Sequence, residues 1–226
     1  MIISEIFYSL QGEGMLAGVP SIFVRLAGCP LRCKWCDTKY AWDPSAGTDY
    51  TIDRIIRTVK QWPCSFVVIT GGEPMVNPDL PQLSNQLKKM NKHVTIETSG
   101  IIFSPDLSCD LMSISPKLSN SLPDEPDLAA IHEKSRLNIN ALQKLIDTYN
   151  YQLKFIIDSE NDLADIKDLI KKISIVDSAK VMLMPQAATR EQLLSKSLLV
   201  AELCKQTGFA FSQRLHILLW NNKMGV

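Results

Sequence analysis

An apolar segment that runs directly into a cysteine-rich loop, SIFVRLAGCPLRCKWCD at residues 21–37, decides the fold of this chain. Its first seven residues are rich in β-branched and aromatic side chains, which is typical of a buried strand. The loop holds Cys29, Cys33 and Cys36, so three thiolates can converge without help from a distant segment. No fourth Cys or His lies nearby in the sequence, as a closed structural zinc site would normally require. An iron–sulfur cluster with one open iron position fits this pattern better.

Working outward from this segment, further apolar stretches alternate with amphipathic ones. We expect strands at residues 21–27, 66–70, 94–97, 111–115, 152–157, 181–184 and 209–212. Apolar residues recur with a helical period at residues 51–62, 80–90, 139–149 and 163–173. A last long helix is expected to begin at a capping box formed by Thr189 and Gln192 and to end at Gly208.

Repeated strand–helix units predict an α/β fold with parallel strands joined by right-handed crossovers. About six such units fit into the chain, fewer than a closed eight-stranded barrel of roughly 250 residues needs. We therefore expect a partial, open TIM-like barrel that forms a single domain over residues 1–226. Residues 115–136 are rich in Ser, Pro, Asp and Glu, which favours a long surface loop rather than a domain boundary.

The composition excludes several classes of partner. Lys plus Arg and Asp plus Glu both number 24, so the formal net charge is zero and gives no electrostatic reason to expect nucleic acid or an anionic membrane. No apolar stretch approaches the roughly 20 residues of a membrane span, and the N-terminus does not resemble a signal peptide. We expect a cytosolic protein. Cys64, Cys109 and Cys204 stand alone and are expected to be small buried apolar residues.

Glycine, proline and polar residues gather directly after the predicted strands. They occur at residues 28–29, 70–74, 97–100, 115–117, 158 and 185–186. In parallel α/β folds the functional site lies at the carboxyl ends of the strands. These separate segments are therefore expected to line one pocket.

The spacing of the cysteine loop, C-x3-C-x2-C, resembles the signature of the radical S-adenosylmethionine superfamily. In that superfamily the thiolates hold a [4Fe–4S] cluster, and the methionyl amine and carboxylate of S-adenosylmethionine chelate the open iron. Residues 70–74, TGGEP, are by themselves compatible with a plain tight turn. The two glycines also let backbone approach a ligand closely, and Glu73 supplies an acceptor for a cationic amine. Beside the cysteine loop, the segment resembles the GGEP motif that meets the methionyl amine.

The chain as a whole resembles one family within this superfamily, the 7-carboxy-7-deazaguanine synthases of the queuosine and 7-deazapurine pathway. SLQGEG at residues 9–14, which taken alone reads as a hairpin turn, belongs to the resemblance. The other segments that carry it are GVPSIFVRLAGCPLRCKWCDT at 18–38, ITGGEP at 69–74, IETSG at 96–100, SPK at 115–117 and RLHILLWNNKMGV at 214–226. The resemblance covers essentially the whole chain and is least specific at about residues 120–180.

This resemblance implies a radical S-adenosylmethionine lyase with a defined reaction. In the family, 6-carboxy-5,6,7,8-tetrahydropterin contracts to 7-carboxy-7-deazaguanine with loss of ammonia. The reduced cluster cleaves the cofactor to a 5′-deoxyadenosyl radical, which takes hydrogen from C6 of the pterin. S-adenosylmethionine is reused and Mg2+ is required. The resemblance also implies a homodimer and a reductant of the flavodoxin or ferredoxin type.

Carried over residue by residue, the resemblance implies four sets of contacts. The [4Fe–4S] ligands are Cys29, Cys33 and Cys36. The S-adenosylmethionine contacts are Trp35, Asp37, Gly72, Glu73, Ser115, Pro116, Lys117, Met184, Pro185, Gln186 and Ala187. The pterin contacts are Leu10, Gln11, Gly12, Glu13, Arg25 and Thr70, and the bidentate fork of Arg25 suits a carboxylate. Thr38 is the Mg2+ ligand, since its hydroxyl is a hard oxygen donor; a simple loop hydrogen bond is the alternative role.

Two other readings stay open on the residues alone. One is a different radical enzyme, such as an activase that installs a glycyl radical on a partner protein, which shares the cysteine loop and GGEP but leaves SLQGEG unexplained. The other is a small zinc or electron-transfer module, which needs no ligand-sized segments after successive strands. His216 lies in an apolar segment and has no assigned role, and neither has the C-terminal tail.

Overall fold

The computed structural model describes residues 1–174, 176–221, 223 and 225–226. The described strands form one nine-stranded sheet in the order β3-β1-β2-β4-β5-β6-β7-β8-β9. The strands are β1 (Ile2–Leu10), β2 (Pro20–Leu26), β3 (Thr48–Asp49), β4 (Phe66–Gly71), β5 (His93–Thr98), β6 (Leu111–Ile114), β7 (Tyr151–Ile157), β8 (Val181–Pro185) and β9 (Ala210–Phe211). From β2 through β4 to β9 every neighbouring pair is parallel, whereas β1 pairs antiparallel with both β2 and β3.

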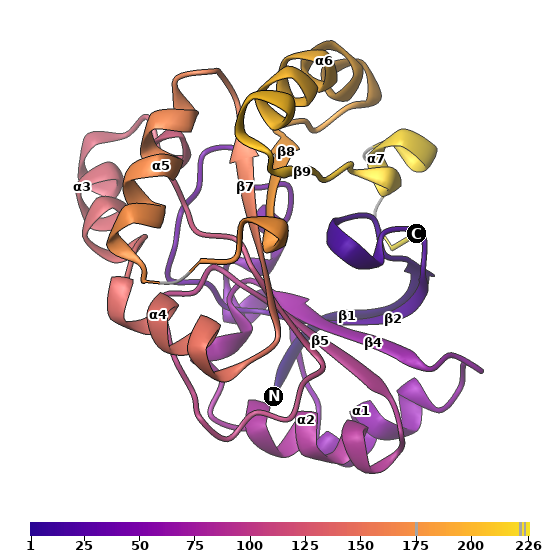
Figure 1. Ribbon diagram of the computed structural model, residues 1–226. Coiled ribbons are helices and arrows are strands. Elements are labelled where there is room, and N and C mark those ends of the chain that lie inside the picture. The colour runs from indigo at the N-terminus through magenta and orange to yellow at the C-terminus, as the bar shows by residue number, and fades with distance from the viewer. Residues whose placement is uncertain (175, 222, 224) are drawn as a thin grey trace.

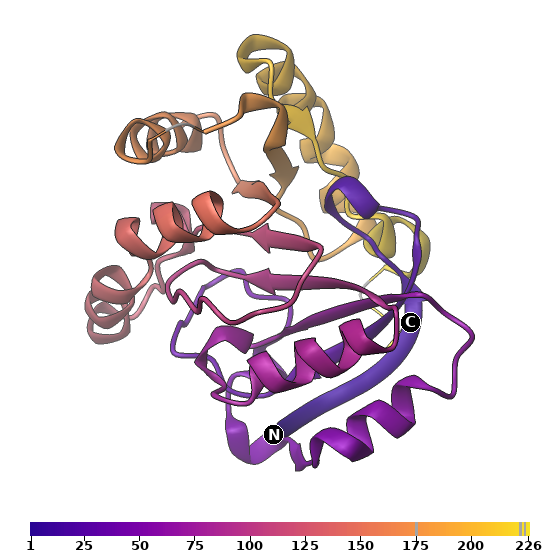
Figure 2. The same ribbon diagram turned by 60° about the horizontal axis from the view of Figure 1, so that its bottom comes forward.

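The sheet curls into an open barrel, as Figures 1 and 2 show. Its two edges, β3 and β9, do not pair, so the barrel is not closed. The helices are α1 (Ile52–Val59), α2 (Leu80–Lys89), α3 (Pro126–Ser135), α4 (Ile139–Thr148), α5 (Asp162–Lys172), α6 (Arg190–Thr207) and α7 (Leu215–Trp220). All but the short α7 lie on the outside of the sheet (Figure 1). The predicted partial α/β barrel is confirmed.

A continuous apolar core joins the sheet to these helices. Ile69 on β4 and Phe155 on β7 have no exposed surface, and neither have Leu83 on α2, Leu142 on α4 and Ile166 on α5. Burying side chains of this size is the main favourable term in folding. The core lies between sheet and helices, which leaves the inner face of the sheet free for polar side chains.

Every predicted strand is present, but two strands escaped prediction. In β1 the pairing with β2 slips between Ile3 and Glu5, so the side chains do not alternate cleanly along the strand. A β-bulge of this kind hides the two-residue period on which strand prediction depends. Together β1 and β2 form a hairpin whose connection is the glycine-rich segment 11–19. SLQGEG therefore lies at the turn of a hairpin, as the segment taken alone indicates.

The prediction of a loop throughout residues 115–136 is wrong, because α3 lies within it. The helix begins where the Glu125 carboxylate accepts hydrogen bonds from the backbone of Asp127 and Leu128, with Pro126 in the first turn. These are favourable helix-start features. The sequence of this helix has no apolar stripe from which it could be predicted, and its large apolar residue Ile131 is 61% exposed.

The ends of the long helix α6 follow the predicted signals closely. The Thr189 hydroxyl accepts from the Gln192 N–H, and Gly208 closes the helix with φ of 75°. The Gln192 side chain accepts from the backbone of Ala188 rather than from Thr189, one residue away from the usual capping box. None of the helices in the described ranges is both long and apolar enough for a membrane crossing.

Candidate active site

The carboxyl ends of the parallel strands surround a cavity of about 500 Å³. Most of the residues predicted for a site line it. These are Leu10, Gln11, Gly12, Glu13, Arg25, Cys29, Cys33, Trp35, Cys36, Asp37, Thr38, Thr70, Gly72, Glu73, Ser115, Lys117, Met184 and Gln186. Pro116, Pro185 and Ala187 do not line it, and all three are buried in the surrounding protein.

A row of polar side chains crosses the inner face of the sheet at the cavity. The register pairs Arg25 of β2 with Thr70 of β4, and Glu97 of β5 with Ser113 of β6. Ser113 in turn pairs with Gln152 of β7, whose amide donates to the Ser113 hydroxyl at 2.8 Å. Paired residues in a parallel sheet point to the same face. The strands therefore supply a polar floor that is suited to a polar ligand.

The cysteine loop forms one wall of the cavity. Cys36 N–H donates to the Cys33 carbonyl at 3.0 Å, and Thr38 N–H donates to the Cys36 sulfur at 3.4 Å. Burial raises the pKa of Cys29 to about 11 and of Cys33 to about 12, so without metal both thiols are protonated at neutral pH. Metal binding to these residues must displace those protons.

Cys29, Cys33 and Cys36 all line the cavity. Among the described residues, no three His, Cys, Asp or Glu side chains converge closely enough to hold one metal ion. In a [4Fe–4S] cube each thiolate binds a different iron atom, so three cysteines can serve three of the four irons. Three cysteines that face one cavity from a single loop therefore fit a cluster.

Glu73 is a buried carboxylate that has hydrogen-bond donors but no ion-pair partner among the described residues. It is 2% exposed and accepts from the Thr98 hydroxyl at 2.7 Å and from the Ser99 backbone at 2.8 Å. A buried charge without a counter-ion is costly. The side chain lines the cavity, so a cationic amine bound there would supply the missing charge.

The two glycines before Glu73 bring protein backbone together, and this differs from the expectation that they make room for a ligand. A Cβ on Gly71 would lie 2.2 Å from the Leu26 carbonyl, and one on Gly72 would lie 2.2 Å from the Gly28 carbonyl. Gly71 also has φ of 143°. The glycines therefore hold the end of β4 against the start of the cysteine loop, although Gly72 still borders the cavity.

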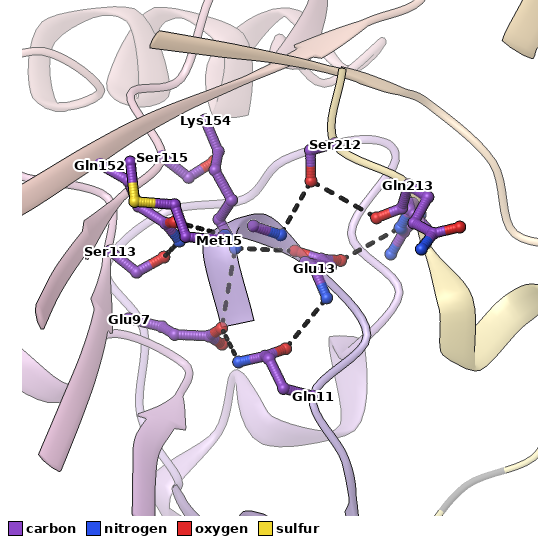
Figure 3. Close-up of polar contacts among 12 residues, drawn as sticks. Gln11, Glu13, Met15, Glu97, Ser113, Ser115, Gln152, Lys154, Ser212 and Gln213 are labelled. Atoms are coloured by element: carbon purple, nitrogen blue, oxygen red, sulfur yellow. Dashed lines mark hydrogen bonds and ion pairs between the residues drawn. The ribbon is translucent and has the colours of Figure 1, made fainter. Parts of the chain in front are cut away.

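A buried charge network joins the N-terminal SLQGEG segment to the sheet (Figure 3). The Lys154 ammonium is 2.9 Å from Glu13 and 3.6 Å from Glu97, and its side chain is 3% exposed. Burial by itself raises the pKa of Glu13, but Lys154 and Arg214 outweigh it and hold the pKa well below its usual range. Glu13 is therefore a carboxylate at neutral pH.

Arg214 links the two halves of the cavity. Its guanidinium contacts Glu13 at 3.1 Å and also pairs with Asp37, which follows the last cysteine of the loop. The backbone of Leu215 donates to the Gly12 carbonyl at 2.8 Å. Figure 1 likewise shows α7 beside the β1–β2 connection. The described part of the C-terminal segment thus packs against the β1–β2 connection at the cavity.

Sequence reasoning missed several lining residues. Lys154, Arg214, His216 and Val226 all face the cavity. A charged residue inside an otherwise apolar strand, such as Lys154 in YQLKFII, was a usable signal. The tail offered none, because its place beside the cavity depends on tertiary packing. His216 is partly buried, and burial lowers its pKa, so the ring is neutral near pH 7.

Arg25 faces the cavity but already has a partner. Its Nε donates to Glu5 at 2.7 Å, and the Tyr40 hydroxyl donates to the same carboxylate oxygen at 2.7 Å. These bonds fix the guanidinium while leaving its terminal nitrogens without a bond from the described residues. Those nitrogens are the fork that a ligand carboxylate would engage.

Comparison with known proteins agrees with this geometry. The family model "Radical SAM superfamily" matches residues 23–175. The 7-carboxy-7-deazaguanine synthase of Rhodopirellula baltica is 40% identical over 100% of this chain and 88% of its own length. The synthase of the same name from Halobacterium salinarum is 38% identical over 97% of this chain and 90% of its own length.

The fold gives the same answer as the sequence comparisons. The crystal structure of QueE from Escherichia coli matches with a TM-score of 0.74 at 25% identity, covering 95% of this chain and 94% of that one. The shared length leaves no large part of either protein unmatched. By sequence and by fold, this chain belongs to the 7-carboxy-7-deazaguanine synthase family of the radical S-adenosylmethionine superfamily.

Proposed function

We propose that the cavity carries out the reaction for which the family is named, the radical ring contraction of 6-carboxy-5,6,7,8-tetrahydropterin to 7-carboxy-7-deazaguanine with loss of ammonia. The proposal rests on one observation: the cysteine loop and the SLQGEG segment line two halves of the same cavity. One half has the cysteine loop and Glu73, which has no ion-pair partner among the described residues, and these suit a cluster and a cationic cofactor. The other has the charged and amide side chains of SLQGEG, which suit a polar heterocycle.

The cofactor half would be held by the cysteine loop and by segments after β4, β6 and β8. Glu73 would accept from the methionyl amine, while Lys117 and Ser115, which bond to each other at 2.9 Å, would border the rest of the cofactor. Trp35, Asp37, Gly72, Met184 and Gln186 also face this side. When bound, the cluster and S-adenosylmethionine supply a carbon radical that removes hydrogen from the pterin. Pro116, Pro185 and Ala187 would contribute only by shaping these segments.

The substrate half would recognise both ends of the pterin. Gln11 and Glu13 present an amide and a carboxylate, which complement the donor and acceptor edge of a pterin ring. Arg25, beside Thr70 on the sheet, would bind the pterin carboxylate. Leu10 and Gly12 complete the segment, and Gly12 has no room for a side chain because a Cβ there would lie 2.0 Å from His216.

We further propose that Thr38 binds Mg2+. Its hydroxyl donates to Asp37 at 2.6 Å, so the loop hydrogen bond of the alternative role is present. A hydroxyl that donates its proton to a carboxylate keeps its oxygen lone pairs for a cation. Mg2+ usually keeps several waters, so one protein ligand is sufficient when the substrate carboxylate supplies others. The ion would then orient substrate rather than stabilise the fold.

The wider setting is proposed on separate grounds. One domain over residues 1–226 is supported by strands from residue 2 to residue 211 in one sheet. All six cysteines are free thiols, which supports a reducing, cytosolic setting. A homodimer and a flavodoxin- or ferredoxin-type reductant follow from the resemblance. Sedimentation and electron transfer from purified flavodoxin or ferredoxin would test these two.

The decisive experiment is a turnover assay under anaerobic conditions. Reconstituted and reduced protein is incubated with the carboxy-tetrahydropterin, S-adenosylmethionine and Mg2+, and the deazaguanine chromophore is followed with and without each component. Formation of product, with S-adenosylmethionine recovered intact, supports the proposal. If the protein binds roughly four irons and four sulfides per chain but forms no product, the cluster assignment stands and the proposed substrate is wrong.

A further inference from the structure

Residues 118–136, the segment that carries the unpredicted helix α3, contact the cysteine loop at Arg32, Lys34 and Trp35. The Nδ1 of His132 accepts from the Arg32 N–H at 3.0 Å. The Ser121 carbonyl accepts from the Lys34 N–H at 3.0 Å. The Asn120 amide oxygen accepts from the Trp35 ring N–H at 3.2 Å. All three contacts lie between the first and last cysteines of the loop.

His132 has an unusual place in this set, because it is 1% exposed on an otherwise exposed helix. Its neighbours Glu133 and Lys134 face solvent, as does Ile131. Burying an imidazole is costly unless both nitrogens have partners. Here Nδ1 contacts Arg32 and Nε2 lies 3.0 Å from the Ser121 hydroxyl, so both are satisfied.

The contacts define the tautomer of this histidine. The Ser121 hydroxyl donates its only proton to the Leu118 carbonyl at 2.6 Å. It must therefore accept from Nε2–H. The Arg32 N–H has one proton to give, so Nδ1 must be the acceptor. The ring is then neutral, protonated on Nε2, and part of one directed chain from the Arg32 backbone to the Leu118 carbonyl.

We propose that His132 is a positioning residue for the cluster, acting through the Arg32 backbone to hold the loop in its ligating shape. The inference rests on the proposed function, since it concerns the cluster that the loop would bind. Arg32 directly precedes Cys33, so its peptide orientation sets where that thiolate points. Anchoring the chain on Leu118 and Ser121, which are buried, ties the loop to the body of the barrel.

The test compares cluster retention in variants of the reconstituted protein. His132→Phe keeps a ring but leaves the Arg32 N–H without an acceptor, and iron release to a chelator is expected to become about 5- to 150-fold faster. His132→Asn places an oxygen where Nδ1 was and should recover most of the loss. Lys134→Ala, an exposed change on the same helix, is the matched control and should match wild type.

Two further measurements separate positioning from general stability. Thermal unfolding identifies any variant whose whole fold is weakened, and deuterium uptake in peptides spanning residues 29–38 reports the loop directly. If His132→Phe does not fold, Ser121→Ala replaces it. This change removes the Nε2 acceptor and the bond to the Leu118 carbonyl but leaves the contact between Nδ1 and Arg32, so it should give intermediate release. Equal iron release in the phenylalanine, asparagine and control variants would overturn the inference. Failure of the wild type to bind iron would instead overturn the proposed function.

Discussion

Replacing Lys154 with Met is expected to destabilise the protein while leaving its cluster in place. Methionine keeps most of the volume of the lysine stem, so the change removes a charge without opening a large cavity. Lys154 lies between Glu13 and Glu97 and is almost fully buried. The substitution leaves these two carboxylates without their shared partner. Lys154 is not in the cysteine loop, so iron content after reconstitution should not change.

The size of the effect follows from the burial of the three side chains. Removing one partner of a fully buried ion pair costs about 3–5 kcal/mol. The carboxylates are 17% and 23% exposed, and Arg214 still neutralises Glu13, so we expect a loss at or below the lower end of this range. A loss of about 2–3 kcal/mol lowers the unfolding temperature by roughly 4–12 °C in a chain of this size.

The stability difference between wild type and Lys154→Met should depend on pH in one direction. The folded pKa of Glu13 lies below its ordinary value of 4.5, so the stabilisation is complete above that value and is lost as pH falls through the folded pKa. The gap between wild type and Lys154→Met should therefore be widest near neutral pH and should narrow below about pH 4.5.

Anaerobic thermal unfolding of the cluster-loaded proteins at several pH values measures both quantities. Lys171→Met is the matched control, because Lys171 is 76% exposed and its one ion pair within the described residues is with the exposed Asp168. Surface pairs of this kind contribute about 0–1 kcal/mol. The reasoning is refuted if Lys154→Met loses no more stability than this control, or if its deficit grows on acidification.

The remaining predictions concern the cluster, the substrate and Mg2+. Alanine at any one cysteine of the cluster loop should abolish the brown chromophore and cofactor cleavage. Alanine at Cys64, which is buried and lies outside the loop, should leave both intact. If the chromophore remained after a loop cysteine was replaced, the ligand assignment would be wrong. Arg25→Ala should weaken pterin binding by on the order of 2–5 kcal/mol, measured by titration, while slow uncoupled cofactor cleavage continues; normal turnover would remove Arg25 from the site. Thr38→Val should lose the stimulation of activity by Mg2+ while its iron content stays unchanged, whereas Thr38→Ser should keep the stimulation. An unaltered Mg2+ response in the valine variant would exclude Thr38 as the ligand.

The sequence alone determined those features that depend on residues close together in the chain. Thiolate spacing is local, so the cysteine loop could be recognised without any fold. Alternating short strands and periodic helices predicted the partial barrel, and turn residues after the strands predicted where a pocket would form. The pairing of Arg25 with Thr70 across neighbouring strands agrees with this expectation.

Only the tertiary structure decided which distant charges meet. Glu13, Lys154 and Arg214 are far apart in the sequence, and curvature of the sheet together with return of the chain end places them in one network. Helix α3 lacked an apolar stripe because its packing depends on the single buried ring of His132. Helix α7 likewise meets the β1–β2 connection through residues distant in the sequence, where the Leu215 N–H donates to the Gly12 carbonyl. Such contacts carry no local period or spacing, because their residues become neighbours only when the chain folds.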